Sequence, residues 1–270
     1  MTLSKKVAFA PINGTDMYFE IQGTGKPLLF LHAGVGDMRM WDQQFDVFAH
    51  THQVIRCDLR GFGQTLLKPS SFTHYEDVAA LLHTLQVAPA VIIGASFGAA
   101  VALDVALAYP TLVTALILAD PAVGGYTFTS SAMLTFFDQE EAALNQGDIH
   151  TATEINLKMW VDGWNRLPAQ VNPSVREQVR IMQDNIFAQI QPEGSIENKL
   201  VPPAYERLAT ITQPTAVIIG AHDVPEFQNL ASTIAQTIPH AQLMTITDAA
   251  HLPNMEQAAI FNQHLANFLI

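Results

Sequence analysis

Residues 94–98, which read Gly-Ala-Ser-Phe-Gly, restrict the fold of this chain more than any other part of its sequence. They follow a β-branched run at 91–93 and precede an apolar stretch with helical spacing at 97–108, so a buried strand is expected to turn sharply into a helix there. Side chains at positions 94 and 98 would collide with neighbouring backbone in so tight a turn, which accounts for the glycines. We expect the turn to hold the Ser96 hydroxyl above the edge of a sheet, with N–H groups of the helix beneath it.

Strand-like and helix-like stretches alternate on both sides of this turn. Strands are expected at residues 7–12, 17–21, 28–31, 54–57, 91–93, 116–118, 216–219 and 243–246, and helices at 39–49, 75–85, 97–108, 227–238 and 255–268. The dipeptide Asn13-Gly14 predicts a hairpin turn between the first two strands. Such alternation predicts an α/β fold with a mostly parallel sheet, helices on both faces and right-handed crossovers.

The alternation stops between residues 123 and 203, where we find no convincing strand. Helical patterns with bulky side chains dominate there, and Pro202-Pro203 closes the stretch. We interpret residues 123–203 as a helical cap inserted after the sixth strand of the sheet, and residues 1–122 and 204–270 as the core domain. Phe136, Phe137, Trp160 and Trp164 are expected to form the interior of the cap first of all, and some of them to line a pocket over Ser96.

Composition narrows the classes of partner. Of 270 residues, 49% are hydrophobic and 14% are charged, which suits a large folded core rather than disorder. There are 13 Lys and Arg against 25 Asp and Glu, a net charge of −12. Because an acidic surface repels phosphate backbones and anionic lipid, we expect neither nucleic acid nor membrane as a partner. We expect a small, largely apolar molecule instead, and homo-oligomer formation stays open.

Two features bear on the compartment. The single cysteine, Cys57, excludes an internal disulfide and fits a reducing environment. The apolar stretch after Lys5-Lys6 is too short for the core of a signal peptide, so a cytoplasmic location is expected.

Residues 87–119 carry one charge, Asp104, and would resemble a membrane span by hydropathy. Prolines interrupt this stretch, and we expect two buried strands around a buried helix.

Two further residues have the chemistry and the expected position to act together with Ser96. Asp223 and His251 each come just after a predicted strand, at residues 216–219 and 243–246. Both therefore belong at the carboxyl edge of the sheet, where open α/β sheets build their sites. A serine hydroxyl needs a base at neutral pH, and histidine titrates near neutrality. We predict Ser96 as nucleophile, His251 as general base and Asp223 as the acid that orients the imidazole.

A second small-residue loop, at residues 31–36, follows the predicted strand at 28–31. Such a loop lets a backbone N–H approach a substrate closely. We expect it to supply one donor of an oxyanion hole, alongside the N–H of Phe97.

Together these motifs resemble the α/β-hydrolase family, in its capped esterase, enol-lactonase and C–C hydrolase branch. Residues 58–65 resemble the D-x-R-G-x-G-x-S loop of that family, with Thr65 at the last position, and His32-Ala33-Gly34 resembles its H-G-x loop, with alanine at the second position. The resemblance implies an α/β-hydrolase fold, no cofactor, and Gly34 as the second oxyanion donor. Serine rather than aspartate at position 96 argues against dehalogenases and epoxide hydrolases.

Several other residues of the sequence have chemistry that could serve in a site. Asp120 ends the predicted strand at 116–118 and is the main alternative to Asp223 as the acid, since some relatives place the acid there. Asp248 and Glu256 are expected to face solvent. His50 and His52 are interpreted as part of a loop without a third ligand, so no metal site is predicted. The loop residue Arg60 is expected to be a structural ion-pair partner.

Three functions fit these residues. The first is hydrolysis of an ester, a lactone or a related small acyl compound through an acyl-enzyme intermediate. The second is hydrolysis of a C–C bond in a diketone-like metabolite. The third is ligand sensing, in which the triad serves recognition. The apolar cap favours a small, apolar or aromatic acyl group.

Overall fold

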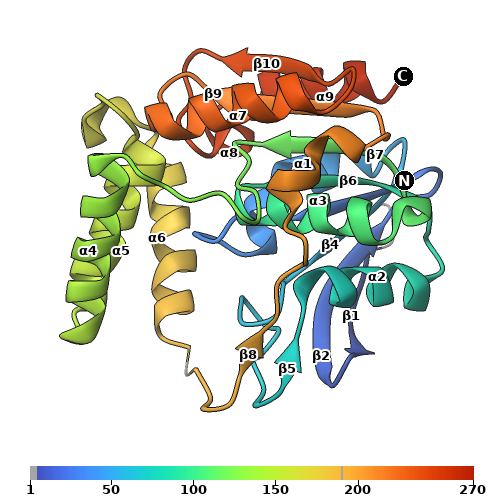
Figure 1. Cartoon of the computed structure of the whole chain (residues 1–270), viewed down its shortest axis with the longest axis horizontal. Coiled ribbons are helices and arrows are strands. Elements are labelled where there is room, and N and C mark those ends of the chain that lie inside the picture. Colours follow the sequence, from blue (N-terminus) through green and yellow to red (C-terminus); the bar gives the residue numbers. More distant parts are fainter. Residues whose placement is uncertain (1–4, 190) are drawn as a thin grey trace.

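The large sheet of this chain has eight strands (Figure 1), in a computed structural model that describes residues 5–189 and 191–270. Residues 1–4, part of the N-terminus considered for a signal peptide, lie outside the described residues. The strand order is β1-β2-β4-β3-β6-β7-β9-β10. The bounds are β1 Lys5–Ile12, β2 Thr15–Gln22, β3 Pro27–Leu31, β4 Gln53–Cys57, β6 Ala90–Ala95, β7 Val113–Ala119, β9 Thr215–Gly220 and β10 Gln242–Ile246. Every strand predicted from sequence is present.

The first two strands differ from the rest in direction. β1 and β2 form an antiparallel hairpin, and β2 also pairs antiparallel with β4, whereas the remaining pairs are parallel. At the hairpin turn, Asn13 and Gly14 have φ angles of 42° and 84°. Two successive positive φ angles match the twist of the flanking strands, as expected for Asn-Gly.

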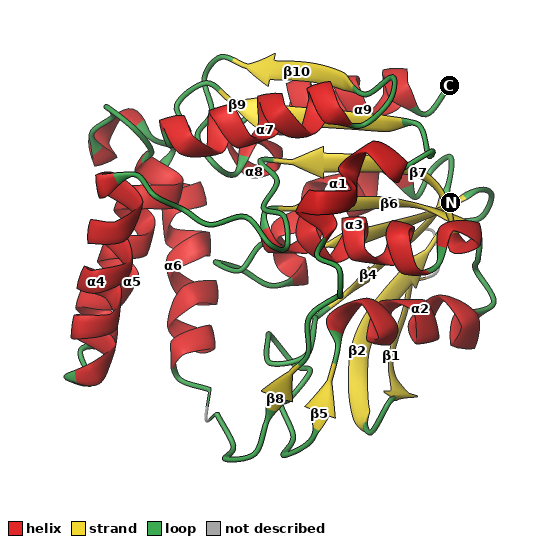
Figure 2. Ribbon diagram, viewed as in Figure 1, coloured by secondary structure: helices red, strands yellow, loops and turns green. Residues whose placement is uncertain are grey.

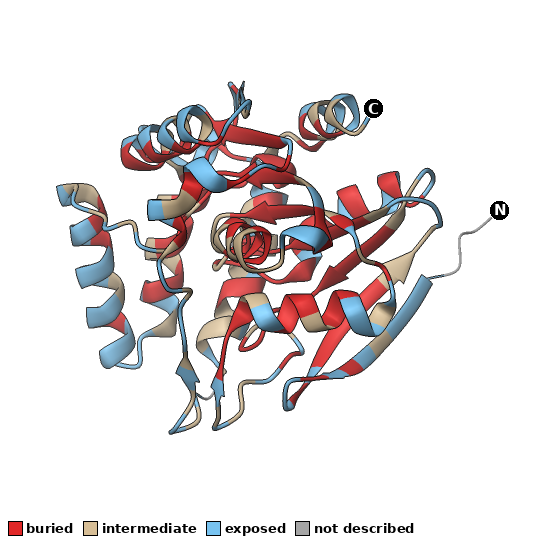
Figure 3. Ribbon diagram, turned by 45° about the vertical axis from the view of Figure 1, so that its right-hand side comes forward, coloured by how far each residue is buried: buried red, intermediate tan, exposed pale blue. Residues whose placement is uncertain are grey.

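Helices cover both faces of the sheet, as Figure 2 shows. They are α1 Asp42–Phe48, preceded by the short 3₁₀-helix η1 Met38–Trp41, then α2 His74–Leu85, α3 Phe97–Ala108, α7 Pro225–Thr237, α8 Pro253–Glu256 and α9 Ala258–Phe268. Alternate strand residues serve the two faces: Leu29 and Leu31 pack with α2 and α3, while Leu28 and Phe30 pack with α1 and α9. The central strands β3, β4, β6, β7 and β9 are consequently buried on both sides, whereas the edge strands β1 and β10 are largely exposed (Figure 3).

The last helical stretch differs from the sequence prediction. We expected one helix over 255–268, but Gln257, with φ −129° and ψ 51°, separates α8 from α9. Hydrogen bonds of Asn254 explain the break. Its side-chain amide donates to the carbonyl oxygen of Met40, and its own carbonyl accepts from Gln44. These bonds hold α8 against η1 and α1, in a direction that α9 does not continue.

Helices dominate residues 123–203, which follow β7, the sixth strand of the large sheet in chain order. They comprise α4 Ser131–Asn145, α5 Ile149–Asn156, the π-helical turn η3 Leu157–Asp162, the 3₁₀-helix η4 Pro168–Gln170 and α6 Pro173–Phe187. Figure 1 shows α4, α5 and α6 standing together beside the sheet. We call this stretch the helical segment, and its division from the core stays a prediction.

The expectation of no strand in the helical segment was wrong at one point. Strand β8 (Ile196–Glu197) pairs in parallel with β5 (Ser71–Phe72). Two residues are too few to produce a periodic pattern in the sequence. The 3₁₀-helix η5 (Ala204–Thr210) follows and leads back to β9.

The helical segment is fixed to the core at its start as well. The carboxylate of Glu226, at the start of α7, accepts hydrogen bonds from the backbone N–H groups of Thr129 and Ser130, at 2.8 and 3.1 Å, and from the Ser130 hydroxyl at 2.6 Å. Ser130 in turn caps α4 through its side chain. Two attachments therefore frame the segment, Glu226 at one end and the β5–β8 pair at the other.

The apolar stretch at residues 87–119 forms β6, α3 and β7, two buried strands around a largely buried helix, as expected. Among the residues that the structure describes, no helix combines the length and the hydropathy that crossing a bilayer requires.

Candidate active site

The turn between β6 and α3 has the strained geometry that its sequence predicted. Ser96 has φ 49° and ψ −110°, a conformation rare for a residue with a side chain. A Cβ atom at Gly94 would collide with the carbonyl of Gly98, and one at Gly98 would collide with the carbonyl of Leu31. The backbone N–H of Ser96 donates to the carbonyl of Ala119 at 2.8 Å. The serine is therefore held at the carboxyl edge of the sheet, partly exposed.

His251 and Asp223 meet Ser96 at this edge. The His251 Nε2 and Ser96 Oγ atoms are 2.8 Å apart, and His251 Nδ1 lies 2.8 Å from Asp223 Oδ2. His251 and Asp223 are 1% and 0% exposed. Since a carboxylate only accepts, Nδ1 carries the proton and Nε2 is left to accept from the serine hydroxyl. The structure thus brings the three predicted residues into one hydrogen-bonded chain.

Asp120, the alternative acid, makes no such bond with His251 in the described part of the chain. It follows β7 and lies beside Asp223, and one of its oxygens accepts the Gly220 N–H at 2.9 Å. Burial and the neighbouring Asp223 charge raise the pKa of Asp120 well above its usual range. The geometry therefore favours Asp223 as the partner of the imidazole.

The two residues expected to form the oxyanion hole, Gly34 and Phe97, are neighbours in the fold. A Cβ atom at Gly34 would lie 3.7 Å from Cβ of Phe97. Across residues 5–189 and 191–270, neither of their backbone N–H groups donates a hydrogen bond to the protein. Both N–H groups therefore stay available for the oxyanion hole that the sequence predicts.

His32 fixes the loop that carries Gly34. Its Nε2 accepts the Leu59 N–H at 2.9 Å, so its Nδ1 carries the proton and donates to the carbonyl of Ala33, also at 2.9 Å. Complete burial lowers the pKa of His32 and keeps the ring neutral. The histidine of the H-G-x motif thus joins two loops through hydrogen bonds.

The loop at residues 58–65 is built around a buried carboxylate. Asp58 accepts the N–H groups of Met38 and Gln64 at 2.9 and 2.8 Å, and burial raises its pKa to about 6. Arg60 pairs with Asp77 at 2.8 Å, with both side chains at 1% exposure or less. Arg60 is therefore a structural residue, as expected.

Aromatic side chains surround the imidazole of His251. The ring of Trp160, from the π-helical turn η3, has its centroid 4.5 Å from that of His251, and Phe227 lies at 4.7 Å. Phe136 packs edge-on against Trp160 at 5.1 Å. Trp160 and Phe136 are buried, whereas Trp164 and Phe137 are 41% and 40% exposed. Half of the predicted interior of the helical segment thus faces solvent.

Sequence reasoning missed the role of Glu256, and the expectation that it faces solvent was wrong. Its side chain is 4% exposed and pairs with Arg166 of the helical segment at 2.6 Å. Its other oxygen accepts the Ala250 N–H at 2.7 Å, next to His251. Burial raises the pKa of Glu256 to about 7 despite Arg166. A signal was present in the sequence. Pro253 marks the start of a helix, and an acid in the first turn of a helix, such as Glu256, often accepts from backbone N–H groups near that start. Asp248 is exposed, as expected.

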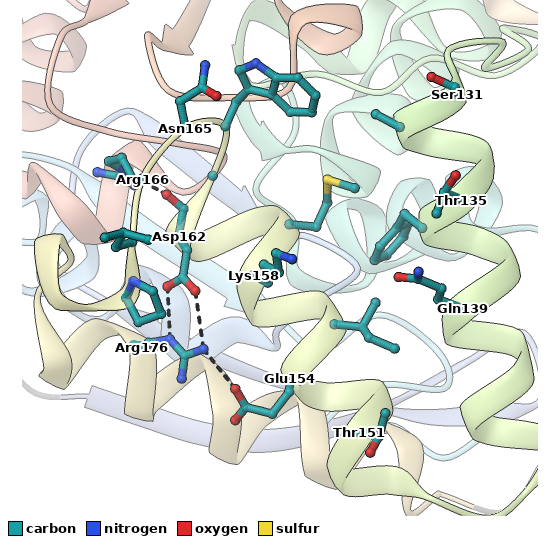
Figure 4. A pocket seen from close by; sticks show the side chains of 18 of the residues that line it. Ser131, Thr135, Gln139, Thr151, Glu154, Lys158, Asp162, Asn165, Arg166 and Arg176 are labelled. Atoms are coloured by element: carbon teal, nitrogen blue, oxygen red, sulfur yellow. Dashed lines mark hydrogen bonds and ion pairs between the residues drawn. The ribbon is translucent and has the colours of Figure 1, made fainter.

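A cavity of about 960 Å³ opens inside the helical segment (Figure 4). Phe136, Met159 and Trp164 line it, together with Lys158 and an ion-paired group of Glu154, Asp162 and Arg176. Neither Ser96 nor His251 lines it, because Trp160 stands between Phe136 and the imidazole. This cavity is therefore not the pocket that the sequence led us to expect over the serine.

One group of described residues has the donor types of a metal site. The ligand atoms of Asp120, Asp223 and His251 all lie within 4.8 Å of one another. However, both ring nitrogens of His251 are engaged, one with Asp223 and one with Ser96. A cation there would displace the hydrogen bond that orients the imidazole. His50 and His52 belong to no such group within the described residues.

Comparisons with known proteins agree with this architecture. A model described as "Alpha/beta hydrolase family" matches residues 28–264. A putative carbamate hydrolase, RutD, from Azorhizobium caulinodans is 28% identical over 259 residues, 94% of each chain.

Solved structures give the same result. An esterase from Thermogutta terrifontis superposes with a TM-score of 0.75 and 26% identity, covering 100% of this chain and 98% of that one. The enol-lactonase from Burkholderia xenovorans reaches a TM-score of 0.78 at 21% identity, covering 97% and 99%, a likeness of fold alone.

Proposed function

Since this chain belongs to the alpha/beta hydrolase family and is a hydrolase, we propose that it cleaves an ester, a lactone or a related small acyl compound with Ser96, His251 and Asp223. The observation that carries the proposal is the hydrogen-bonded chain from Ser96 Oγ through His251 to Asp223, with both distances 2.8 Å. That chain supplies a base for the serine proton and an acid that fixes the imidazole tautomer.

The first half of the reaction forms an acyl-enzyme. Ser96 Oγ attacks the carbonyl carbon of the substrate as its proton passes to Nε2 of His251. The carbonyl oxygen becomes an oxyanion and accepts hydrogen bonds from the N–H groups of Gly34 and Phe97. The bond to the leaving group then breaks, and the leaving group takes the proton from His251.

The second half restores the enzyme. Water gives a proton to His251 Nε2 and attacks the acyl carbon. The bond to Ser96 Oγ then breaks, the serine recovers its proton from His251, and a carboxylic acid leaves. Asp223 stabilises the imidazolium in both halves without leaving its hydrogen bond.

We propose the helical segment, residues 123–203, as the lid over this site. Trp160 packs on His251, and its neighbour Phe136 is buried behind it. On the oxyanion side, a Cβ atom at Gly36 would lie 3.3 Å from Cε of Met182, a residue of α6. Apolar walls on two sides favour a small apolar or aromatic acyl group and exclude water from the reaction.

Turnover of p-nitrophenyl acetate by the purified chain tests the proposal. We expect repeated turnover that EDTA leaves unchanged and that a fluorophosphonate abolishes. A single slow acylation without turnover would contradict hydrolysis and favour ligand sensing. Absence of any reaction with acyl esters, combined with cleavage of a vinylogous diketone, would favour the C–C hydrolase instead.

A further inference from the structure

Asp120 is a buried acid beside the proposed triad to which the mechanism above gives no task. It follows β7 directly, with φ 41°, in the left-handed region that residues with side chains rarely adopt. Its backbone N–H donates to the carbonyl of Ile218 at 2.8 Å, and its Oδ1 accepts the Gly220 N–H at 2.9 Å. Two bonds to β9 thus hold a strained residue with its carboxyl next to Asp223.

The second oxygen of Asp120 has no donor. Oδ2 is buried and lacks a hydrogen-bond partner among the described residues. The oxygens of Asp223 both have one: Oδ1 accepts the Val224 N–H at 2.7 Å, and Oδ2 accepts from His251. Two buried, ionised carboxylates side by side repel each other strongly, whereas one proton between them turns the repulsion into a hydrogen bond.

The charged groups around Asp120 do not offset its negative charge, so a bound proton is what neutralises it. Glu256, from α8, is a third acid whose charge acts on Asp120. The positive charge of Arg166 is paired with Glu256, at 2.6 Å. His251 donates its Nδ1 proton to Asp223 rather than to Asp120. Burial and these acids raise the pKa of Asp120 well above its usual range, in agreement with the geometry.

We propose that Asp120 is a positioning residue that keeps a proton at neutral pH and donates it in a hydrogen bond to Asp223. The acid of the triad is then a carboxyl pair that shares one proton and one negative charge. The charge resides on Asp223, which faces His251, because Asp120 holds the proton.

This inference rests on the proposed function and adds two consequences to it. The Asp120 hydroxyl fixes the plane of the Asp223 carboxylate, so the imidazole stays aimed at Ser96. The same bond withdraws charge from Asp223 and weakens its hold on the imidazolium, which shifts the pH dependence of activity. The pair thereby extends activity toward acidic pH.

Two substitutions at position 120 separate this role from the alternatives. Asp120→Asn keeps both a donor toward Asp223 and an acceptor toward Gly220, so kcat should stay within about threefold of the unmodified enzyme. Asp120→Ala removes the donor, and one lost hydrogen bond of this kind should lower kcat/KM about tenfold. The acid limb of the pH–activity profile of Asp120→Ala should also move to higher pH, whereas that of Asp120→Asn should not. Asp104→Asn, at a half-buried acid of α3, is the control and should change neither kcat/KM nor the pH dependence of activity.

A loss of about 10⁴-fold in Asp120→Asn would overturn the proposal, because that is the loss expected if Asp120 were the ionised acid of the triad. Equal losses in the Asn and Ala variants would overturn it as well. Infrared difference spectra give a measurement that needs no activity. The unmodified protein minus Asp120→Asn should show the C=O stretch of a protonated carboxyl at pH 7. A missing band refutes the proton even if the chain is an active hydrolase, and a band in a chain without esterase activity refutes only the proposed function.

Discussion

Trp160 lies against His251, with 4.5 Å between the ring centroids and 41° between the ring planes. The backbone carbonyl of Trp160 also accepts the His251 N–H at 3.3 Å. Trp160 belongs to the π-helical turn η3, and such wide turns shift the residues after them out of α-helical register. An element of the helical segment thus positions both the ring and the backbone of the proposed base.

Trp160→Ala should therefore affect stability and specificity together. Loss of a buried Trp lowers the free energy of unfolding by about 3–5 kcal/mol. The space left beside His251 should shift the ranking of p-nitrophenyl esters toward longer or bulkier acyl groups. Urea titrations and kcat/KM across an ester series measure the two effects. Trp164→Ala, at a half-exposed ring, is the control, and an equal loss of stability there would contradict this account.

Ser96→Ala should abolish esterase turnover and labelling by a fluorophosphonate. Members of a triad act as a unit, so the expected loss of kcat is on the order of 10⁴-fold or more. Circular dichroism should show an unchanged fold, because alanine fits the same turn. Ser174→Ala, at an exposed serine of α6, should remain fully labelled. A labelled Ser96→Ala protein would exclude Ser96 as the nucleophile.

Asp223→Asn should lower kcat on the order of 10⁴-fold, because asparagine neither stabilises the imidazolium nor holds the required tautomer. The exposed Asp248, three residues before His251, provides the control. Asp248→Asn should leave kcat unchanged. If both variants retained activity, the acid of the triad would have to be sought elsewhere.

Glu256→Gln should loosen the loop that carries His251. Glutamine can still accept the Ala250 N–H, but the buried Arg166 loses its counter-charge, which lowers the free energy of unfolding by about 3–5 kcal/mol. The double variant Arg166→Met/Glu256→Leu removes both charges and should recover much of that loss. Thermal melts of the three proteins decide the point, and a single variant as stable as the unmodified chain would argue against the ion pair.

Asp104 should make stability fall as pH rises. Burial raises its pKa to about 7 in the folded state, despite Lys199 and Arg207, from an ordinary value of 3.8. The folded chain thus binds this proton more tightly than the unfolded chain does. The resulting stabilisation is complete below about pH 4 and is lost as pH rises through about 7. Asp104→Asn should therefore flatten the dependence and be the more stable protein at pH 8, as urea titrations at pH 5 and pH 8 would show. A steeper decline in the variant would contradict the assignment.

The sequence predicted those parts of the molecule that depend on neighbouring residues in the chain. The glycines at 94 and 98, the Asn13-Gly14 turn and the apolar runs each specify a local conformation, and all three were found. The positions of Asp223 and His251 also followed, because both come directly after strands that end at the same edge of the sheet.

What the sequence did not predict depends on contacts between distant residues. The pairing of Glu256 with Arg166 joins side chains 90 positions apart, and neither residue belongs to a periodic pattern. The β5–β8 pair has two residues in each strand, too few for a signal. The π-helical turn at Trp160 spans six residues, too few to produce a periodic pattern of its own.

The attachments at the two ends of the helical segment determine where it could be cut and exchanged for the corresponding segment of a relative. A graft with its first junction before residue 129 would bring new partners to the carboxylate of Glu226, which now accepts from Thr129 and Ser130. A graft ending before Ile196 would keep the pairing with Ser71 and Phe72. Residues 131–195 are therefore the stretch to exchange in a chimera. Both junctions would then lie outside the helices, next to contacts that the recipient already provides.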